Sequence, residues 1–312
     1  MVRLISRLNI LIVDLFVFLI LLFYTAIYNK NLFIISIPYG RWGNRIMLFS
    51  YLISWAQKHN CQIINPSFAE YSEYFPYFKN NKLCFFPDEE NNFIKILSLF
   101  SRHVNKAVKR LTLRKFKLPY CHIVDLENKY KNTNSLNIKS LINDKKIILF
   151  HGFLFGERDY TLVDSNRELL NYVFSFTKNI NDRCFELRNN ISFDKIIGVC
   201  MRQGDYKTYL DGKFYLNDSK YLELIKNLTS IFPEYGIFIA CEELKVNFKP
   251  DNSIVSYQNP ALNLCMLSKC DFLIGPPSTF LTWAAFYNNI EVCYIDNTNW
   301  NRDSYNFNVT SF

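Results

Sequence analysis

Charged and hydroxyl side chains follow apolar, strand-like runs at several points in the second half of the sequence. Arg202 and Asp205 come directly after the run 195–201, in the stretch GVCMRQGDY, and Ser278 and Thr279 follow another such run after Gly-Pro-Pro. An arginine guanidinium is a planar fork of donors that suits a diphosphate. The alternative for this arginine is an ordinary charged turn at the protein surface, so the surrounding elements have to decide between the two.

Two further features at strand ends could bind the same ligand. A helix that opens with Ser278 and Thr279 would offer backbone N–H groups and its positive dipole end to an anion, although simple N-capping explains the same residues. Glu242 and Glu243 follow the run 236–241 and could accept hydrogen bonds from a base or a sugar, or lie in a solvated turn. Together these features favour a nucleotide diphosphate as the ligand.

The elements that carry these side chains alternate between strand and helix patterns. Apolar runs predict strands and apolar stripes of helical spacing predict helices, with Ser219 as a candidate N-cap. The predicted strands are 195–201, 236–241, 253–257, 271–275 and 291–295, and the predicted helices are 219–231, 260–270 and 279–288. Such alternation predicts a parallel sheet with helices on both faces, whose ligands bind at the carboxyl ends of the strands.

The first half begins with a similar βαβ pattern. Strands are expected at 32–37 and 61–64 around a helix at 45–59, and a further strand is expected at 146–150. Between them, 93–113 has the pattern of a basic amphipathic helix. Its apolar face could pack on the core with the basic face in solvent, or the helix could dock on a membrane surface.

The N-terminal region contains an almost wholly apolar run, 10–27. Eighteen residues in a helix span about 27 Å, which is close to the hydrocarbon core of a bilayer. The run predicts an uncleaved, single-pass membrane anchor, and Arg3 and Arg7 before it favour a cytoplasmic N-terminus. Asp14 departs from this pattern, although a carboxylate near a helix end can reach the membrane interface. The alternatives are a buried amphipathic helix and a cleaved segment.

Composition and length limit the possible functions. The 312 residues, of which 49% are apolar, suffice for two compact domains, and we expect an anchor at 1–30 and domains at 31–175 and 176–312. The formal charge of +8 suits phosphate-bearing ligands or an anionic membrane. No nucleic-acid-binding motif occurs, so no nucleic-acid partner is expected. The sequence has no P-loop, no GxGxxG and no DxD triplet, which counts against kinase chemistry, dinucleotide redox and metal-dependent sugar transfer.

Four ordered motifs resemble the α-1,2-fucosyltransferase family, glycosyltransferase family 11. GRWGNR at 40–45 is similar to the family's GRLGNQ, and CMRQGDY at 200–206 is similar to its HxRRGDY. STF at 278–280, followed by WA, resembles STFSWWA, and CEE occurs where the family has SDD or SDE. The resemblance covers about 33–50 and 195–296 and is more specific for the wider group of GDP-fucose-using enzymes than for one linkage.

This resemblance implies a fold, a donor and a reaction. The fold would be α/β and GT-B-like, with two Rossmann-like domains facing a cleft. The donor would be GDP-fucose, and transfer would invert the sugar without a metal or other cofactor. The acceptor would be a glycan hydroxyl, with an α-1,2 linkage to galactose as the family's product. In a eukaryote, the membrane-anchored protein would be expected in the Golgi.

The resemblance also assigns roles to residues of the second domain. Arg202 would bind the donor phosphates and, together with Asp205, act in catalysis. Ser278 and Thr279 would bind the β-phosphate, and Glu242 would lie near the guanine base. No residue is expected to bind a metal.

Other motif positions lie in the first domain or depart from the family. Gly43 and Asn44 would approach the donor from the first domain. Cys200 occupies the donor-binding position where the family has a histidine, Gln203 the position of a second arginine, and Arg45 the position of a glutamine. A thiol donates and accepts hydrogen bonds poorly, so the identity of the nucleotide sugar stays open.

The motifs do not identify the general base, for which Asp205, Glu157 and Asp159 are the candidates. Transfer from another nucleotide sugar is an alternative within enzymes. An alternative from another class is a catalytically silent, membrane-tethered glycan-binding protein with the same fold. The intact arginine and Ser-Thr motifs argue against this second alternative, and the cysteine in CMRQGDY argues for it.

Overall fold

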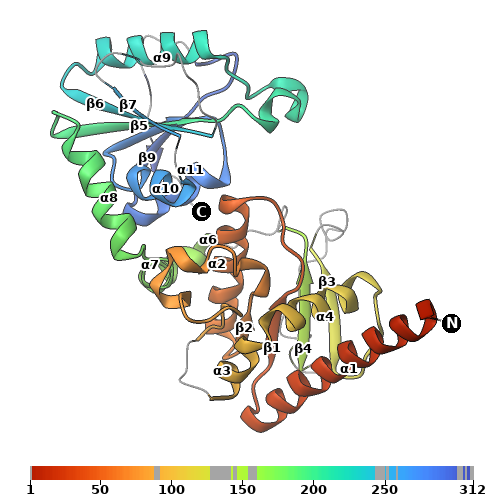
Figure 1. Ribbon diagram of the computed structural model, residues 1–312. Coiled ribbons are helices and arrows are strands. Elements are labelled where there is room, and N and C mark those ends of the chain that lie inside the picture. Colours follow the sequence, from red (N-terminus) through yellow and green to blue (C-terminus); the bar gives the residue numbers. More distant parts are fainter. Residues whose placement is uncertain are drawn as a thin grey trace. The chain divides into compact units, whose positions relative to one another are not determined.

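The computed structural model describes residues 2–87, 92–126, 142, 146–153, 160–242, 250, 253–257, 259–300, 305 and 308–309. The chain divides into two compact units, Met1–Ser175 and Phe176–Phe312. Each unit is built around its own β-sheet, whose strands are mainly parallel (Figure 1). The α/β class expected from the alternating pattern is therefore present in both units.

The sheet of the first unit has four parallel strands in the order β2-β1-β4-β3. These strands are β1 (Leu32–Ile35), β2 (Gln62–Ile64), β3 (Cys121–Asp125) and β4 (Ile147–His151). Three of them lie where the sequence predicts strands, with slightly shifted ends, whereas β3 is not among the predicted elements. β3 is an edge strand of mostly half-exposed residues, so it lacks the continuous apolar run that marks its neighbours.

Helices cover both faces of this sheet. On one face lies α2 (Trp42–Lys58), whose Trp55 contacts Phe150, a ring that also contacts Phe33. The other face is covered by α1 (Val2–Tyr28), α3 (Asn92–Leu99) and α4 (Ser101–Leu113). The first unit also contains the short helices η1 (Pro66–Phe68), η2 (Ser72–Tyr74), η3 (Pro76–Phe78), α6 (Tyr160–Ser165) and α7 (Arg167–Val173).

The predicted helix at 93–113 is two helices in the structure. The helical backbone is interrupted at Phe100, which has φ −100° and ψ 14°. One side of α3 and α4 packs in the core of the first unit, as the first of the two expected alternatives required; it consists of Ile94, Leu97, Val104, Ala107, Val108 and Leu111.

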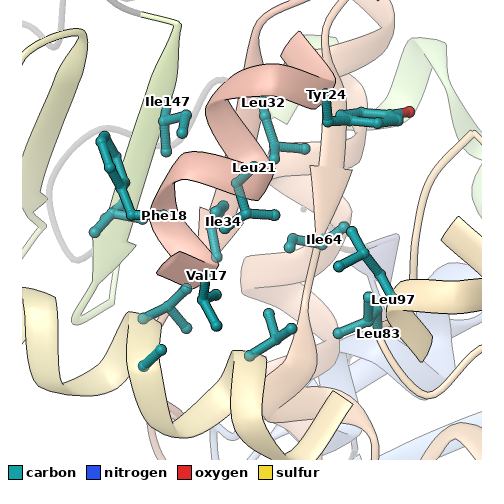
Figure 2. Close-up of a cluster of buried hydrophobic side chains, with 14 of the residues drawn as sticks. Val17, Phe18, Leu21, Tyr24, Leu32, Ile34, Ile64, Leu83, Leu97 and Ile147 are labelled. Carbon is teal, nitrogen blue, oxygen red and sulfur yellow. The ribbon is translucent and has the colours of Figure 1, made fainter. Parts of the chain in front are cut away.

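The helix α1 belongs to the same core. Figure 2 shows Val17, Phe18, Leu21 and Tyr24 on the side of α1 that faces the sheet, where they are buried with side chains of β1, β4, α3 and α4. The stretch Asn9–Tyr28 is long and apolar enough to cross a membrane, but core helices and signal sequences meet the same criterion. The predicted apolar helix is thus present, and its passage through a bilayer stays a prediction.

Asp14 is fully buried beside Arg110 of α4. The guanidinium of Arg110 donates from Nε to Asp14 Oδ2 at 2.8 Å and to Oδ1 at 3.1 Å, and from Nη2 to Oδ1. A buried carboxylate without a partner would be strongly destabilising, so this bidentate pair accounts for an acid inside an apolar helix. The expectation that Asp14 reaches a membrane interface is wrong for this structure, since its partner is a protein side chain.

The second unit has a six-stranded sheet in the order β10-β9-β8-β5-β6-β7, in which β10 alone is antiparallel to its neighbour. The strands are β5 (Lys195–Met201), β6 (Tyr235–Cys241), β7 (Ser253–Ser256), β8 (Phe272–Gly275), β9 (Glu291–Tyr294) and β10 (Asn308–Val309). The five strands predicted for this half are present, each with ends within one residue of the expected positions.

Helices cover both faces of the second sheet as well (Figure 1). One face is covered by α9 (Asp218–Ile231), and the other by α8 (Lys178–Asn189), α10 (Pro260–Leu267) and α11 (Thr279–Asn288). The bounds of α11 are those predicted, whereas α10 ends three residues before the predicted end at 270. The N-cap of α9 is Asn217 and not Ser219, because the Asn217 side chain accepts from Lys220 N at 2.9 Å.

The GVCMRQGDY stretch begins with a glycine, Gly198, because neighbouring side chains pack closely against its backbone. A Cβ on this glycine would lie 2.6 Å from Leu273 Cδ2 and 2.9 Å from Leu267 Cδ2. Both distances are too short for real atoms, so the centre of β5 needs a glycine where α10 and β8 pack on it.

Replacing Arg110 with methionine should destabilise the first unit. Methionine keeps much of the aliphatic packing but leaves the buried Asp14 carboxylate without its cation, and breaking a buried pair in this way costs about 3–5 kcal/mol. Equilibrium urea unfolding measures the change. The double variant Asp14→Leu/Arg110→Met should recover most of the loss, because no buried charge then remains. The matched control is Arg102→Met on the exposed side of α4, with an expected change within about 0.5 kcal/mol. Equal stability of Arg110→Met and Arg102→Met would contradict the role of the pair.

Candidate functional site

The strand order of the second sheet reverses at β5. The chain continues from β5 to β6 and β7 on one side, and β8 and β9 lie on the other side. In open α/β sheets, ligands bind at such a switch point, outside the carboxyl ends of the strands. Arg202 follows β5 and Ser278 follows β8, so the two predicted phosphate-binding elements border the switch point.

The guanidinium of Arg202 is held by two carboxylates. Nη1 donates to Glu242 Oε1, and Nη2 donates to Asp205 Oδ1 at 3.0 Å. The Cζ atom of Arg202 lies 5.2 Å from the centroid of the Tyr206 ring, within cation–π range. The backbone N–H of Arg202 donates to Tyr221 Oη at 3.1 Å. Asp205 and Glu242, which are both predicted site residues, are therefore each in direct contact with Arg202.

The three side chains of this cluster differ in exposure. The Arg202 side chain is 17% exposed, that of Glu242 is 23% exposed and that of Asp205 is 56% exposed. Burial lowers the pKa of Arg202, but the negative charges around it, with Glu242 foremost, outweigh burial and the pKa is raised. The arginine is therefore a permanent cation near the surface of the second unit, and Asp205 is the partner most open to solvent.

The third nitrogen of the Arg202 guanidinium, Nε, donates to neither carboxylate. Nε is buried and has no hydrogen-bond partner among the described residues. Leaving a buried donor of a charged group unsatisfied is unfavourable. A ligand oxygen that bound Nε would remove this penalty, although the groups that cover Nε would have to move.

Two more residues of the same motif fix the loop that follows β5. Tyr206 Oη donates to Pro277 O at 2.6 Å, which ties this loop to the segment before α11. Gln203 is buried, and its Nε2 donates to Leu216 O at 2.8 Å and to Asp218 Oδ1 at 2.9 Å. The position where the resembling family has a second arginine is therefore occupied by an amide that holds the start of α9.

Ser278 is the N-cap of α11. Its Oγ accepts from Leu281 N at 3.1 Å, so N-capping, one of the two expected alternatives, is present. Capping occupies only one N–H group of the first turn. The other N–H groups of a helix N-terminus and its positive dipole end still favour an anion at this position, next to Thr279.

Cys200 lies at the end of β5 and is buried. Burial raises the pKa of its thiol to about 12, although the charge of Arg202 lowers it. A Cβ on Gly275 would lie 2.8 Å from Cys200 O, so β8 packs closely against this position. The thiol is therefore neutral and enclosed by protein, and a direct contact between Cys200 and a ligand would need its neighbours to move.

The predicted residues of the first unit lie at the start of α2. Gly43 is buried and Asn44 is half-buried. Gly40 has φ +60°, and a Cβ on it would lie 2.2 Å from Asn44 Nδ2, so the loop before α2 needs a glycine there. Arg45 donates from Nε to Gly40 O at 3.0 Å and pairs with Glu70. Arg45 thus stabilises the loop from inside the first unit.

The structure brings some of the predicted site residues together and leaves others as predictions. Arg202, Asp205 and Glu242 form one cluster in the second unit. Gly43 and Asn44 belong to the first unit, so their approach to the cluster stays a prediction. The remaining predicted acids lie outside the described residues; they are Glu157, Asp159 and Glu243.

Sequence reasoning missed the supporting roles of Tyr206 and Tyr221. Tyr206 belongs to the CMRQGDY motif, so its position next to Asp205 was a signal that could have been used. Tyr221 lies on α9, nineteen residues after Arg202, and nothing in its local sequence indicates that its hydroxyl reaches the end of β5.

No protein-family model matches the sequence, and no curated protein matches it either. Solved structures do share its fold. A mutant of Arabidopsis thaliana FUT1 in complex with GDP has a TM-score of 0.54 at 12% identity, over 89% of this chain and 74% of that one. The α-1,6-fucosyltransferase NodZ soaked with GDP-fucose has a TM-score of 0.51 at 14% identity, over 90% and 99%. POFUT1 in complex with GDP-fucose has a TM-score of 0.50 at 10% identity, over 84% and 94%. These likenesses show a common fold, two α/β units of the GT-B-like kind.

The burial of Cys200 leads to a prediction about its reactivity. Because the pKa of the thiol is raised to about 12, it stays protonated at neutral pH and should react slowly with iodoacetamide. Cys121, which is half-exposed, should be alkylated first. Mass spectrometry after timed alkylation at about pH 8 measures the order of labelling. Unfolding in urea is the control and should make both thiols react. Fast labelling of Cys200 in the folded protein would show that its site is open.

Proposed function

We propose that this protein is a glycosyltransferase that transfers fucose from GDP-fucose to a glycan hydroxyl. The observation that carries the proposal is the position of Arg202 and the N-terminus of α11 on either side of the switch point of the second sheet. Both elements favour phosphate oxygens, and the motifs that contain them resemble the motifs of α-1,2-fucosyltransferases. The fold shared with proteins that were crystallised with GDP or GDP-fucose supports the same donor.

The finer features of the reaction are part of the proposal. We propose inversion at the sugar without a metal ion, and an α-1,2 linkage to galactose as the product, because the motifs are closest in pattern to family 11. In a reaction without metal, the leaving diphosphate needs fixed positive groups as its charge develops. Arg202 and the first turn of α11 would supply them.

The contacts of Arg202 suggest how the donor enters. A diphosphate would compete with the carboxylates for the guanidinium, and Asp205 is the more exposed of the two. We propose that Asp205 is displaced or shared when the donor binds, while Glu242 keeps Arg202 in place. Glu242 would then position the arginine in addition to any contact it makes with guanine. Of the three candidates for the general base, Asp205 is the one whose position the structure describes.

A second candidate function is a catalytically silent protein that binds a nucleotide or a glycan. The observation that favours it is the pair of altered motif positions, since Cys200 is enclosed and Gln203 is used within the fold. Offering a set of nucleotide sugars and measuring which diphosphate is released separates the candidates. Release of GDP from GDP-fucose supports the transferase, release from another donor corrects the sugar, and GDP binding without release supports the silent protein.

Membrane attachment through residues 10–27 completes the proposal. The sequence predicts a single-pass anchor with a cytoplasmic N-terminus, and a Golgi location in a eukaryote, but the packing of α1 on the first sheet and the Asp14–Arg110 pair favour attachment without crossing. The glycan acceptor would then be carried by molecules that meet the protein at the membrane.

Replacing Arg202 should reduce turnover of GDP-fucose without unfolding the protein. Arg202→Lys keeps the charge but loses the planar fork, and a charge-assisted hydrogen bond contributes roughly 1.5–3 kcal/mol. The transfer rate should fall about ten- to a hundredfold, and further in Arg202→Ala. Turnover and GDP affinity are measured beside the melting temperature. Arg114→Lys after α4 is the control, because this side chain is exposed, and it should behave as wild type. Turnover close to wild type in Arg202→Ala would show that the GVCMRQGDY stretch is an ordinary charged turn.

Excess EDTA should leave fucose transfer nearly unchanged. The reason is the missing DxD triplet, together with an arginine and a helix N-terminus that can stabilise the leaving diphosphate. The assay compares initial rates with and without chelator, and a DxD-containing transferase measured in parallel shows that the chelator works. Loss of activity that Mn²⁺ or Mg²⁺ restores would contradict a metal-independent mechanism.

A further inference from the structure

The helix α1 is apolar on the side that faces away from the protein as well as on the side that packs on it. Its outward stripe consists of residues that are between 56% and 62% exposed: Ile12, Phe16, Leu19, Phe23 and Ile27. Their spacing of four, three, four and four residues places them on one side of a helix, opposite the buried side that contains Val17, Leu21 and Tyr24. A surface helix of a soluble protein normally has polar residues on this outward side.

The inward side fixes α1 to the first unit. Asp14 is paired with Arg110, Leu21 is buried in one core with β1 and β4 (Figure 2), and Tyr24 contacts Phe85 and Phe93. If α1 crossed a bilayer, it would leave this position. The face of the sheet around Leu32 would lose its cover, and the Asp14 carboxylate would enter hydrocarbon without its cation, which is unfavourable. Crossing the membrane is therefore an unfavourable way to cover the outward stripe.

The helices beside α1 bring positive charge to the same layer. α1, α3 and α4 cover one face of the first sheet together, so their outward sides point away from the sheet in the same direction. On α4 the outward residues are Arg102, Lys106, Lys109 and Leu113, all exposed. Residues 92–119 contain eight Lys or Arg and no Asp or Glu. The net charge of this segment therefore equals that of the whole chain, +8.

Exposed apolar side chains also occur on α3 and at its end. Ile96 is 56% exposed, Leu99 is 81% exposed and Phe100 is 55% exposed. We call the outward residues of α1, α3 and α4 the α1–α3–α4 face. This face combines large apolar groups with a single sign of charge, which is the combination that binds the headgroup region of an anionic bilayer.

We infer that the α1–α3–α4 face docks on an anionic lipid surface, with α1 lying in the plane of the interface and the whole chain on one side of the bilayer. Charge decides between a lipid surface and a second copy of the chain. A symmetric dimer through this face would bring two identical basic surfaces together, which is unfavourable, whereas anionic headgroups neutralise them. The inference concerns the first unit and is independent of the donor that the second unit uses.

Vesicle flotation with the full-length chain tests the lipid partner. Binding to phosphatidylcholine vesicles that contain phosphatidylglycerol should exceed binding to phosphatidylcholine alone and should weaken in high salt. Phe16→Ser/Phe23→Ser and Lys106→Glu/Lys109→Glu should each weaken binding roughly tenfold or more. The matched controls are Phe185→Ser on α8, which is 64% exposed, and Lys226→Glu on α9. Unchanged binding of both double variants would overturn the inference.

A second measurement separates an in-plane helix from a spanning one. The full-length chain with an epitope before Met1 is added to preformed vesicles, and protease is then added outside. An in-plane α1 keeps the epitope on the outer side, where it is digested. A spanning α1 carries it into the lumen, where it is protected, and protection would overturn the inference. If the α1–α3–α4 face formed dimers instead, Phe16→Ser/Phe23→Ser would abolish the dimer and leave vesicle binding unchanged. That result would also overturn the inference.

Discussion

The ion pair between Arg202 and Glu242 depends on the parallel pairing of β5 and β6 up to their last residues. Met201 pairs with Cys241, so the next residue of each strand leaves the sheet at the same edge. A shift of this register by one residue would send alternate side chains to the opposite face and separate the guanidinium from the carboxylate. The apolar runs of the two strands are what fix the register, since Ile197, Val199 and Ile239 are buried in one core. The packing of the sheet thus determines the chemistry at its edge.

The same edge is held together by polar contacts that do not bind a ligand. Tyr206 joins the loop after β5 to Pro277, and Gln203 joins it to the start of α9. In the first unit, Arg45 has a similar role in the loop before α2. Two of these residues stand where the resembling family has a different side chain. Their partners lie within the same unit, so the changes affect how the loops are held as well as what they could bind.

Much of the second unit could be predicted because buried parallel strands and the helices between them have simple patterns. The runs at 195–201 and 271–275 and the helix at 279–288 follow directly from apolar periodicity. β3 could not be predicted in this way, because an edge strand with half-exposed residues has no continuous apolar run. The ion pairs of Arg202 with Asp205 and Glu242 were not among the predictions, whereas the position of these residues at the carboxyl ends of parallel strands was expected. The hydroxyl of Tyr221 was not, since its contact depends on how α9 lies over the sheet.

The packing of α1 in the first unit has a consequence for synthesis. Its inward side needs α4 and β4, and β4 ends at His151, more than a hundred residues after α1. At the usual rate of translation, on the order of ten seconds pass before these partners leave the ribosome. During that time the newly made helix presents apolar residues on all sides and cannot be distinguished by composition from a membrane-inserted segment. Whether a targeting factor binds it first or the sheet folds under it is then a competition between rates, and the pair formed by Asp14 and Arg110 favours the folded outcome.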